Sequence, residues 1–187
     1  MKNLYLIGGG GHCHSCIDVI EQENKYQIKG IFDLPDKIDK EILGYKVIGT
    51  DKEIESYIRE DNYFLVTIGQ IGGPNKRLEY SKLNLATVIS PRAYVSKNSI
   101  IGHGSIIMHD VIINSNAKIG YNCIINSKAL IEHDAIIENH CHISTGSIVN
   151  GGAMIRRNTF FGSNSMVKEN VVVEKNSVIK GGSIILK

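Results

Sequence analysis

The chain contains no tryptophan, and aromatic residues make up only 6% of its 187 residues. A core with so few aromatic rings has to be built mainly from aliphatic side chains. No apolar run reaches the ~20 residues that a membrane-spanning helix needs. The first apolar run is a short segment that ends in glycines, so no secretory signal is predicted after Met1. We therefore expect a cytoplasmic protein.

Charge of one sign is also scarce, because the net charge is +2 and the lysines are scattered without a basic stripe. A nucleic-acid partner is therefore not expected. The four cysteines do not resemble a disulfide framework. Cys13 and Cys16 have CxxC spacing, but they lie where a helix is predicted to begin and no second pair accompanies them. A metal or redox role for this pair is the alternative to buried, reduced thiols.

The second half of the chain carries a strict six-residue repeat. Six is a multiple of the strand period of two and not of the helical period of 3.6, so the pattern indicates extended segments that each aim one side chain inward. The residue two places earlier is nearly always small, which suits a sharp bend once per unit. Stacked hexapeptides of this kind predict a parallel β-helix, with 18 residues in each coil. The repeated apolar positions are Val95, Ile101, Ile107, Ile113, Ile119, Ile125, Ile131, Ile137, Ile143, Val149, Ile155, Phe161, Val167, Val173, Ile179 and Ile185.

The first half reads as alternating strands and helices, which predicts a small parallel sheet. We place the domain boundary between residues 87 and 88, giving domains 1–87 and 88–187. A helix should follow the glycines of residues 8–11, and Thr50 with Glu53 forms a capping-box pattern for a second helix to about residue 59. The expected strands are 4–7, 28–32, 45–48 and 64–68, and a third, short helix is expected at 76–83.

The glycines after the first strand form a candidate phosphate site. Glycine lets backbone N–H groups approach a phosphate closely, and the following helix N-terminus adds partial positive charge. The third glycine of the dinucleotide fingerprint is missing, since Cys13 stands there, and the domain is too short for two mononucleotide halves. We therefore predict a mononucleotide site, with Asp33 accepting hydrogen bonds from the base or ribose. A tight turn that binds nothing is the alternative.

The clearest candidate for acid–base chemistry is His133 beside Asp134, because a carboxylate can orient a histidine and stabilise its cation. One coil of 18 residues places Gly151 over His133, where its N–H could stabilise an oxyanion. His142 is half a coil away, so it could meet His133 only across two neighbouring prisms. A zinc site shared between subunits is the rival interpretation of this cluster. The remaining repeat histidines are interpreted as solvated, namely His103, His109 and His140.

Nearly the whole chain resembles the left-handed β-helix acetyltransferases of bacterial surface-sugar biosynthesis, the NeuD/PglD-like family. The resemblance rests on six segments, which are residues 7–12, 30–33, 67–69, 89–91, 131–134 and 142–144. Two features depart from the family pattern. Leu34 stands where a second acidic residue often occurs, and the chain lacks the usual Gly-x-Pro-Ala-Lys tail.

The resemblance implies a Rossmann-like nucleotide-sugar-binding domain followed by a left-handed parallel β-helix. It also implies a homotrimer with active sites between subunits and acetyl-CoA as co-substrate, without a metal. By similarity, His133 is the general base and Asp134 its partner, while His142, Gly151, Gly152 and Gly162 contact acetyl-CoA. The nucleotide-sugar would be held by Gly10, Gly11, His12, Asp33 and Gly69.

The predicted function is N-acetylation of a nucleotide-linked 4-amino-sugar for a bacterial surface glycan. Two alternatives stay open at this point. One is O-acetylation of a sialic-acid-like sugar, and the other is a catalytically silent trimeric scaffold. The sequence itself does not name the sugar or the base of the nucleotide.

Overall fold

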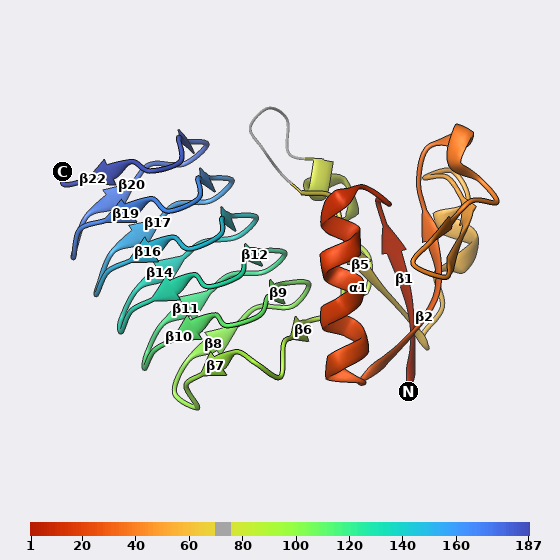
Figure 1. Ribbon diagram of the computed structural model, residues 1–187, viewed down its shortest axis with the longest axis horizontal. Helices are drawn as coiled ribbons and strands as arrows, with labels where there is room; N and C mark the ends of the chain where they lie inside the picture. The colour runs from red at the N-terminus through yellow and green to blue at the C-terminus, as the bar shows by residue number, and fades with distance from the viewer. Residues whose placement is uncertain (70–75) are drawn as a thin grey trace.

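The computed structural model describes residues 1–69 and 76–187, which form two halves side by side. An α/β half comes first, and a long parallel β-helix follows (Figure 1). Helix α1 (Gly11–Glu23) lies between the first sheet and the β-helix and contacts β6 (Val88–Ile89), the first strand of the β-helix. The two predicted architectures are confirmed.

The first sheet has the order β3-β4-β2-β1-β5. Its central strands pair in parallel as predicted, while β3 adds an antiparallel edge through a hairpin with β4. Apolar side chains that alternate along β1 and β2 are buried, so the sheet is held by aliphatic packing. The strands are β1 (Lys2–Ile7), β2 (Tyr26–Phe32), β3 (Glu41–Ile42), β4 (Tyr45–Gly49) and β5 (Asn62–Val66).

Helix α1 forms where the glycine run predicts it, because its apolar residues recur at helical spacing and face the core. It ends at Asn24, whose left-handed backbone lets its N–H donate to the Ile20 carbonyl over 3.0 Å. The buried face consists of Cys13, Cys16, Ile17, Val19 and Ile20.

The other two helix predictions are wrong in type and length. The segment after Thr50 forms only the 3₁₀ turn η2 (Ile54–Tyr57), and the later segment forms η3 (Lys76–Tyr80). Glu53 does accept the Thr50 N–H at 2.7 Å, so half of the capping box exists. The Tyr57 carbonyl then accepts the Asn62 side-chain amide at 2.8 Å, which ends the turn. Tyr57 also packs edge-on against Phe32, so tertiary contacts override helical propensity.

All four cysteines are buried free thiols. Burial raises the pKa of the Cys13 thiol to about 11 and raises the pKa of Cys16 further. A redox or metal role requires the thiolate, which these surroundings disfavour. The pair therefore serves the packing of α1 against the sheet.

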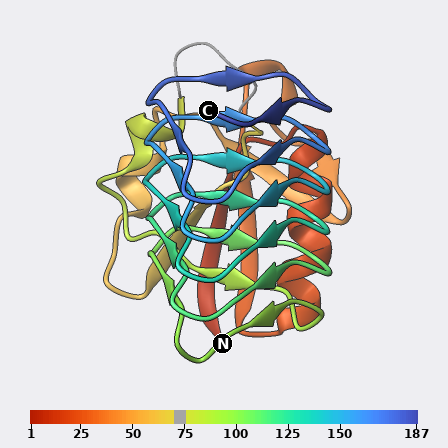
Figure 2. The same cartoon turned by 90° about the vertical axis from the view of Figure 1, so that its left-hand side faces the viewer.

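The β-helix consists of two-residue strands stacked in three parallel sheets of six, five and six strands (Figure 2). Residues 18 apart pair directly, as Leu130 does with Ile148, so the predicted coil length is confirmed. The coils are left-handed, as the resemblance implies. The strands after β6 are β7 (Tyr94–Val95), β8 (Ile100–Ile101), β9 (Ile106–Ile107), β10 (Ile112–Ile113), β11 (Lys118–Ile119), β12 (Ile124–Ile125), β13 (Leu130–Ile131), β14 (Ile136–Ile137), β15 (His142–Ile143), β16 (Ile148–Val149), β17 (Met154–Ile155), β18 (Phe160–Phe161), β19 (Met166–Val167), β20 (Val172–Val173), β21 (Val178–Ile179) and β22 (Ile184–Ile185).

From Gly104 onward each corner of the prism uses one residue with a left-handed backbone. The repeat apolar residues fill the interior, and in the middle coils the small residues two places earlier are buried at the bends. The residue just before each of these small ones has positive φ, a conformation that asparagine, aspartate and glycine adopt at least cost. These residues are Gly104, Asp110, Asn116, Asn122, Lys128, Asp134, His140, Gly146, Gly152, Asn158, Asn164, Asn170, Asn176 and Gly182.

The three outer faces of the prism differ in what covers them. The face of β6, β9, β12 and β15 lies against the α/β half, so Ile106 and Ile124 are fully buried although they point outward. The other two faces leave apolar side chains in solvent. On the β7 to β22 face the outward side chains of Tyr94 and Ile184 are 60% and 64% exposed, and on the β8 to β20 face that of Ile100 is 60% exposed.

In the part of the chain that the structure describes, no helix combines the length and the apolar character that crossing a bilayer demands.

Candidate functional site

A cavity of about 660 Å³ opens at the carboxyl ends of β1, β2 and β5. This edge is where parallel α/β sheets bind ligands. All five residues predicted to hold a nucleotide line this cavity, so the fold brings them together. They are Gly10, Gly11, His12, Asp33 and Gly69.

The glycine loop that forms one wall needs glycine at two positions for steric reasons. Gly8 has φ of +99°, and a methyl group there would lie 2.5 Å from the Ile68 side chain. A methyl group at Gly9 would lie 2.6 Å from an Asp33 carboxylate oxygen. The space at Gly10 and Gly11 is open, so there the absence of a side chain leaves the backbone accessible from the cavity.

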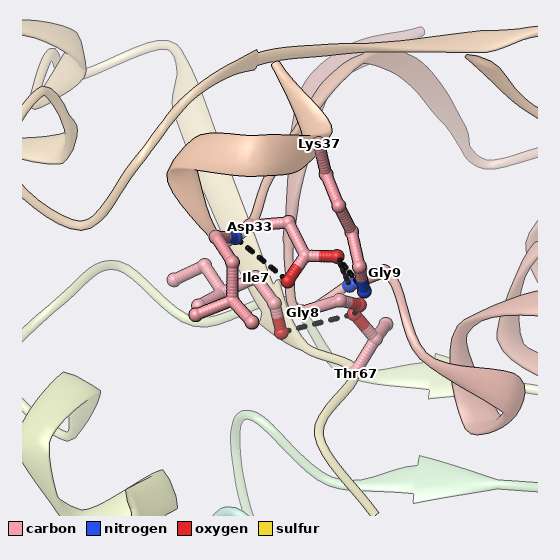
Figure 3. A network of polar contacts seen from close by, with 7 residues as sticks. Ile7, Gly8, Gly9, Asp33, Lys37 and Thr67 are labelled. Atoms are coloured by element: carbon pink, nitrogen blue, oxygen red, sulfur yellow. Dashed lines mark hydrogen bonds and ion pairs between the residues drawn. The ribbon is translucent and has the colours of Figure 1, made fainter. Parts of the chain in front are cut away.

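Asp33 organises this loop from within (Figure 3). Its Oδ2 accepts the Gly9 N–H at 3.0 Å and pairs with Lys37 Nζ at 2.8 Å, while Oδ1 accepts the Leu34 N–H at 2.9 Å. Thr67 adds a second tie, since its hydroxyl donates to the Gly8 carbonyl at 2.6 Å. The side chain of Asp33 is only 10% exposed. Most of its acceptor capacity is therefore spent on the protein itself, which the sequence did not reveal.

We expect Asp33→Ala to weaken the binding of UDP or GDP about tenfold or more, because three charge-assisted hydrogen bonds that shape the loop are lost. Asp33→Asn keeps one acceptor oxygen, so its affinity for UDP or GDP should lie between those of wild type and Asp33→Ala. Asp36→Ala, an exposed neighbour, is the matched control and should bind as wild type. Calorimetry measures this, and equal affinity of Asp33→Ala and wild type would contradict the organising role.

His12 and His142 meet where the two halves touch. Their ring centroids lie 6.2 Å apart, and His142 also packs edge-on against Phe160 at 5.2 Å. His142 is only 5% exposed, and its Nε2 lies 3.3 Å from the Asn126 side-chain amide nitrogen. Burial, reinforced by His142, lowers the pKa of His12 to about 3. His12 is therefore neutral at physiological pH.

This buried histidine predicts acid sensitivity of the fold. His12 titrates near pH 6.5 when unfolded and near pH 3 when folded. Below pH 6.5 the unfolded chain binds a proton that the folded chain does not, so the free energy of unfolding should fall between pH 6.5 and 3. From pH 7 to pH 4.5 the loss from His12 should be about 2 kcal/mol. Urea unfolding at pH 7 and pH 4.5 measures this drop in the free energy of unfolding. The drop should be smaller in the His12→Gln variant. An equal loss in that variant would contradict the assignment.

His133 and Asp134 form the predicted pair. His133 Nδ1 lies 2.8 Å from Asp134 Oδ2, and the other carboxylate oxygen accepts the Asn116 side-chain amide at 3.2 Å. The hydrogen bond from His133 is the main cause of the lowered pKa of Asp134. Asp134 is also a corner residue with φ of +62°, so the bend itself aims its carboxylate. The His133 side chain is 66% exposed, and among the described residues its Nε2 makes no hydrogen bond.

Gly151 lies directly over the His133 ring, as the 18-residue spacing predicts. A methyl group at Gly151 would be 2.8 Å from His133 Cε1 and 2.9 Å from Nε2. Within residues 1–69 and 76–187 the Gly151 N–H donates no hydrogen bond. Gly152 is the corner residue of that coil with φ of +67°, and Gly162 packs its Cα against the backbone of residues 179–181. The left-handed backbone at Gly152 and the close backbone contact at Gly162 thus account for glycine at these two positions.

The structure does not bring His133 and His142 together within one chain. His133 and Gly151 stand at the corner between the two open faces of the prism, whereas β15 places His142 on the covered face. A single chain therefore holds the two parts of the predicted site on different sides.

The interpretation of the remaining repeat histidines needs one clear correction. His140 is buried, at 5% exposure, and its Nδ1 lies 3.1 Å from the Asn122 side-chain amide nitrogen. Burial lowers the pKa of His140 to about 4. His109 Nδ1 lies 2.7 Å from the Ser90 hydroxyl, and only His103 is exposed, stacked on Tyr121. Each of these partners lies about one coil away along the chain, so the 18-residue spacing could have indicated them.

Residues 1–69 and 76–187 contain no group of three histidine, cysteine or acidic side chains arranged to hold a metal ion. The basic residues near Gly151 are partly engaged, since Arg156 pairs with Glu138 at 3.2 Å.

Together the cavity and the prism define a class of protein, a left-handed hexapeptide-repeat β-helix joined to a small α/β ligand domain. Residues 3–80 match the family model of the PglD N-terminal domain. Over 115 residues the chain is 31% identical to UDP-N-acetylbacillosamine N-acetyltransferase from Bacillus subtilis (strain 168), which covers 58% of this chain and 52% of that protein. The matched region spans about half the length of this relative.

Solved structures share the whole architecture. A variant of perosamine N-acetyltransferase from Caulobacter crescentus, in complex with CoA and GDP-perosamine, superposes with a TM-score of 0.88 at 24% identity, covering 100% of this chain and 90% of that one. The acetyltransferase domain of PglB from Neisseria gonorrhoeae FA1090 gives 0.87 at 25% identity, with coverage of 100% and 92%. The resemblance to the NeuD/PglD-like family is thereby confirmed.

Proposed function

We propose that the protein transfers an acetyl group from acetyl-CoA to the amine of a nucleotide-linked 4-amino-sugar for a bacterial surface glycan. The observation that carries the proposal is the His133–Asp134 pair beneath Gly151, 18 residues further along the prism. A general base, its orienting carboxylate and a backbone N–H without a partner are the parts that acyl transfer needs. The named relatives favour an amine over a hydroxyl as acceptor, since they are N-acetyltransferases.

In the proposed reaction, the sugar amine attacks the acetyl carbonyl and His133 Nε2 accepts the amine proton. Asp134, whose lowered pKa keeps it ionised, stabilises the imidazolium through Nδ1. The Gly151 N–H faces the oxyanion of the tetrahedral intermediate, and CoA leaves as the thiolate when this collapses. Holding both substrates next to His133 supplies much of the rate enhancement.

The cavity beside the glycine loop is the proposed nucleotide-sugar site. Its glycine backbone and the N-terminus of α1 suit a diphosphate. The buried His12 Nε2 has no hydrogen-bond partner in the described part of the chain, and an acceptor or donor on the ligand would satisfy it. His142, adjacent to His12, is proposed to lie near the thioester of acetyl-CoA. Gly152 and Gly162 are proposed to line the surface on which CoA binds.

A homotrimer would complete the site. Each prism in a trimer meets two neighbours, and two of the three faces of this prism carry exposed apolar side chains while the third is covered by the α/β half. Contiguous apolar surface of this kind is typical of a subunit interface. His133 stands at the corner between the open faces, so a neighbouring chain would bring its own cavity and His142 to it.

The direct test is CoA release from acetyl-CoA with a panel of UDP- and GDP-linked 4-amino-sugars. At least one amino-sugar should be turned over, with one acetyl group gained by mass spectrometry, and the same sugar already acetylated at that amine should be inert. If no amino-sugar releases CoA but a sialic-acid-like sugar does, the O-acetyltransferase alternative replaces the proposal. If the protein does not bind acetyl-CoA at all, the scaffold alternative does.

A further inference from the structure

One buried side chain connects the ligand cavity to the β-helix. The guanidinium of Arg77, which is 1% exposed, binds two groups on opposite sides. On one side Nη1 donates to the carbonyls of Val66 and Ile68, the latter at 3.3 Å. On the other side Nη2 donates to the Oδ1 of Asn122 at 2.7 Å. The Asn122 amide returns a hydrogen bond to the Arg77 carbonyl at 2.9 Å.

This link lies far from the place where the chain itself crosses between the halves. The crossing at β6 has its own tie, in which Glu23 accepts the Ile89 N–H at 3.1 Å. Asn122 precedes β12, which is two strands beyond β6 in the same sheet. Between these two places the halves are joined by apolar packing of Ile106 and Ile124, which has no directional preference of its own. The Arg77 contact adds a directional polar tie that restrains the angle between the two halves.

Both ends of the link lead to the candidate site. The Val66–Ile68 backbone continues into Gly69 in the cavity wall, and a methyl group at Gly69 would lie 3.3 Å from the Cβ of His12. At the other end, the Asn122 amide nitrogen lies 3.1 Å from Nδ1 of His140, two residues before His142. Arg77 thus joins the wall that holds His12 to the corner that leads to His142.

An arginine is well suited to this task. Its planar fork presents donors in fixed directions and can bind two separate acceptors at once, which the single ammonium of lysine cannot reproduce. Burial lowers its pKa only to about 10, so it stays charged at neutral pH. Burying such a charge is costly compared with apolar packing, so its value lies in fixing a specific geometry.

We propose that Arg77 is a positioning residue that sets the distance and angle between the nucleotide-sugar cavity and His142. This inference rests on the proposed acetyl transfer and deepens it. Loss of the link would leave each substrate bound by its own half but would misalign the two. A misplacement of about 1 Å is enough to slow a two-substrate reaction severely.

The test uses Arg77→Lys and Asn122→Gly in the full chain. Glycine tolerates the left-handed backbone of Asn122, φ 53°, so that variant removes the amide without straining the corner. For both variants kcat should fall about 10- to 100-fold, while the Kd for UDP or GDP and the KM for acetyl-CoA change less than about twofold. The double variant should be no slower than the slower single one. Arg92→Lys, which alters an exposed pair with Asp110, is the matched control.

Unchanged kcat in both variants would overturn the inference, as would a loss of nucleotide affinity in step with a lowered Tm. Hydrogen exchange provides a readout that does not need turnover. Amides of residues 66–69 and 120–124 should exchange faster in Arg77→Lys than in wild type at equal Tm. If the wild-type protein transfers no acetyl group, the proposed function fails, and unchanged exchange in these segments would then separately refute the positioning role.

Discussion

Replacing His133 with alanine is expected to lower kcat for acetyl transfer by about 10²- to 10⁴-fold, the range that a positioned general base contributes. His133 is an exposed corner residue whose side chain is 66% accessible and whose one side-chain hydrogen bond among the described residues is to Asp134. Its removal should therefore leave Tm and the binding of UDP or GDP unchanged. Steady-state kinetics measures kcat, and calorimetry on the same preparation measures Tm and nucleotide binding.

His103→Ala is the matched control, since His103 is also an exposed repeat histidine and lies outside the proposed site. It should retain wild-type kcat. If His133→Ala turns over as fast as His103→Ala, another group accepts the proton and the assignment of the base is wrong. If both variants lose activity together with Tm, the effect is on the fold and not on the base.

Replacing Gly151 with alanine is expected to reduce kcat about 100-fold through a purely steric effect. The new methyl group would lie 2.8 to 2.9 Å from the His133 ring, so the imidazole has to turn away from its productive position. The backbone of Gly151 has no positive φ, so alanine introduces no strain there, and its N–H remains available. The loss would therefore report on the position of the base and not on the oxyanion donor.

Two comparisons make this second result decisive. In a His133→Ala background, Gly151→Ala should cause little further loss, because the ring that it displaces is already gone. Gly181→Ala places a methyl group over Ser163 in another coil and should stay near wild type. Full activity of the Gly151→Ala variant would contradict the proposed location of the catalytic groups.

The periodic part of the site could be predicted because a β-helix converts sequence separation directly into distance. Eighteen residues separate Gly151 from His133, and the structure indeed stacks them. The left-handed corners also leave a signal in the sequence, since asparagine, aspartate or glycine stands at nearly every sixth position from 104 onward, with Lys128 and His140 as exceptions. This recurrence indicates that Asp134 occupies a corner, which aims its carboxylate.

The parts that the sequence could not supply are those that depend on contacts between distant segments. Asp33 lines the cavity as expected, but the sequence did not show that it also holds the glycine loop through Gly9 and Lys37. His140 was expected in solvent but is buried, in contact with Tyr121 and with Asn122, which Arg77 binds from the α/β half. The helix predicted after Thr50 shrinks to one 3₁₀ turn because Tyr57 packs on the sheet. In each case a tertiary partner outweighs a local preference.

The sequence by itself determined the two architectures, the coil length, the stacking of Gly151 on His133 and the residues that gather around the cavity. These follow from local geometry, because strand period, glycine conformation and parallel-strand topology act over short stretches of chain. Only the tertiary structure decided how the two halves are joined, which prism faces stay open, and that His142 lies beside His12. Those features arise from side chains such as Arg77, whose partner Asn122 is 45 residues away and which no short-range pattern encodes.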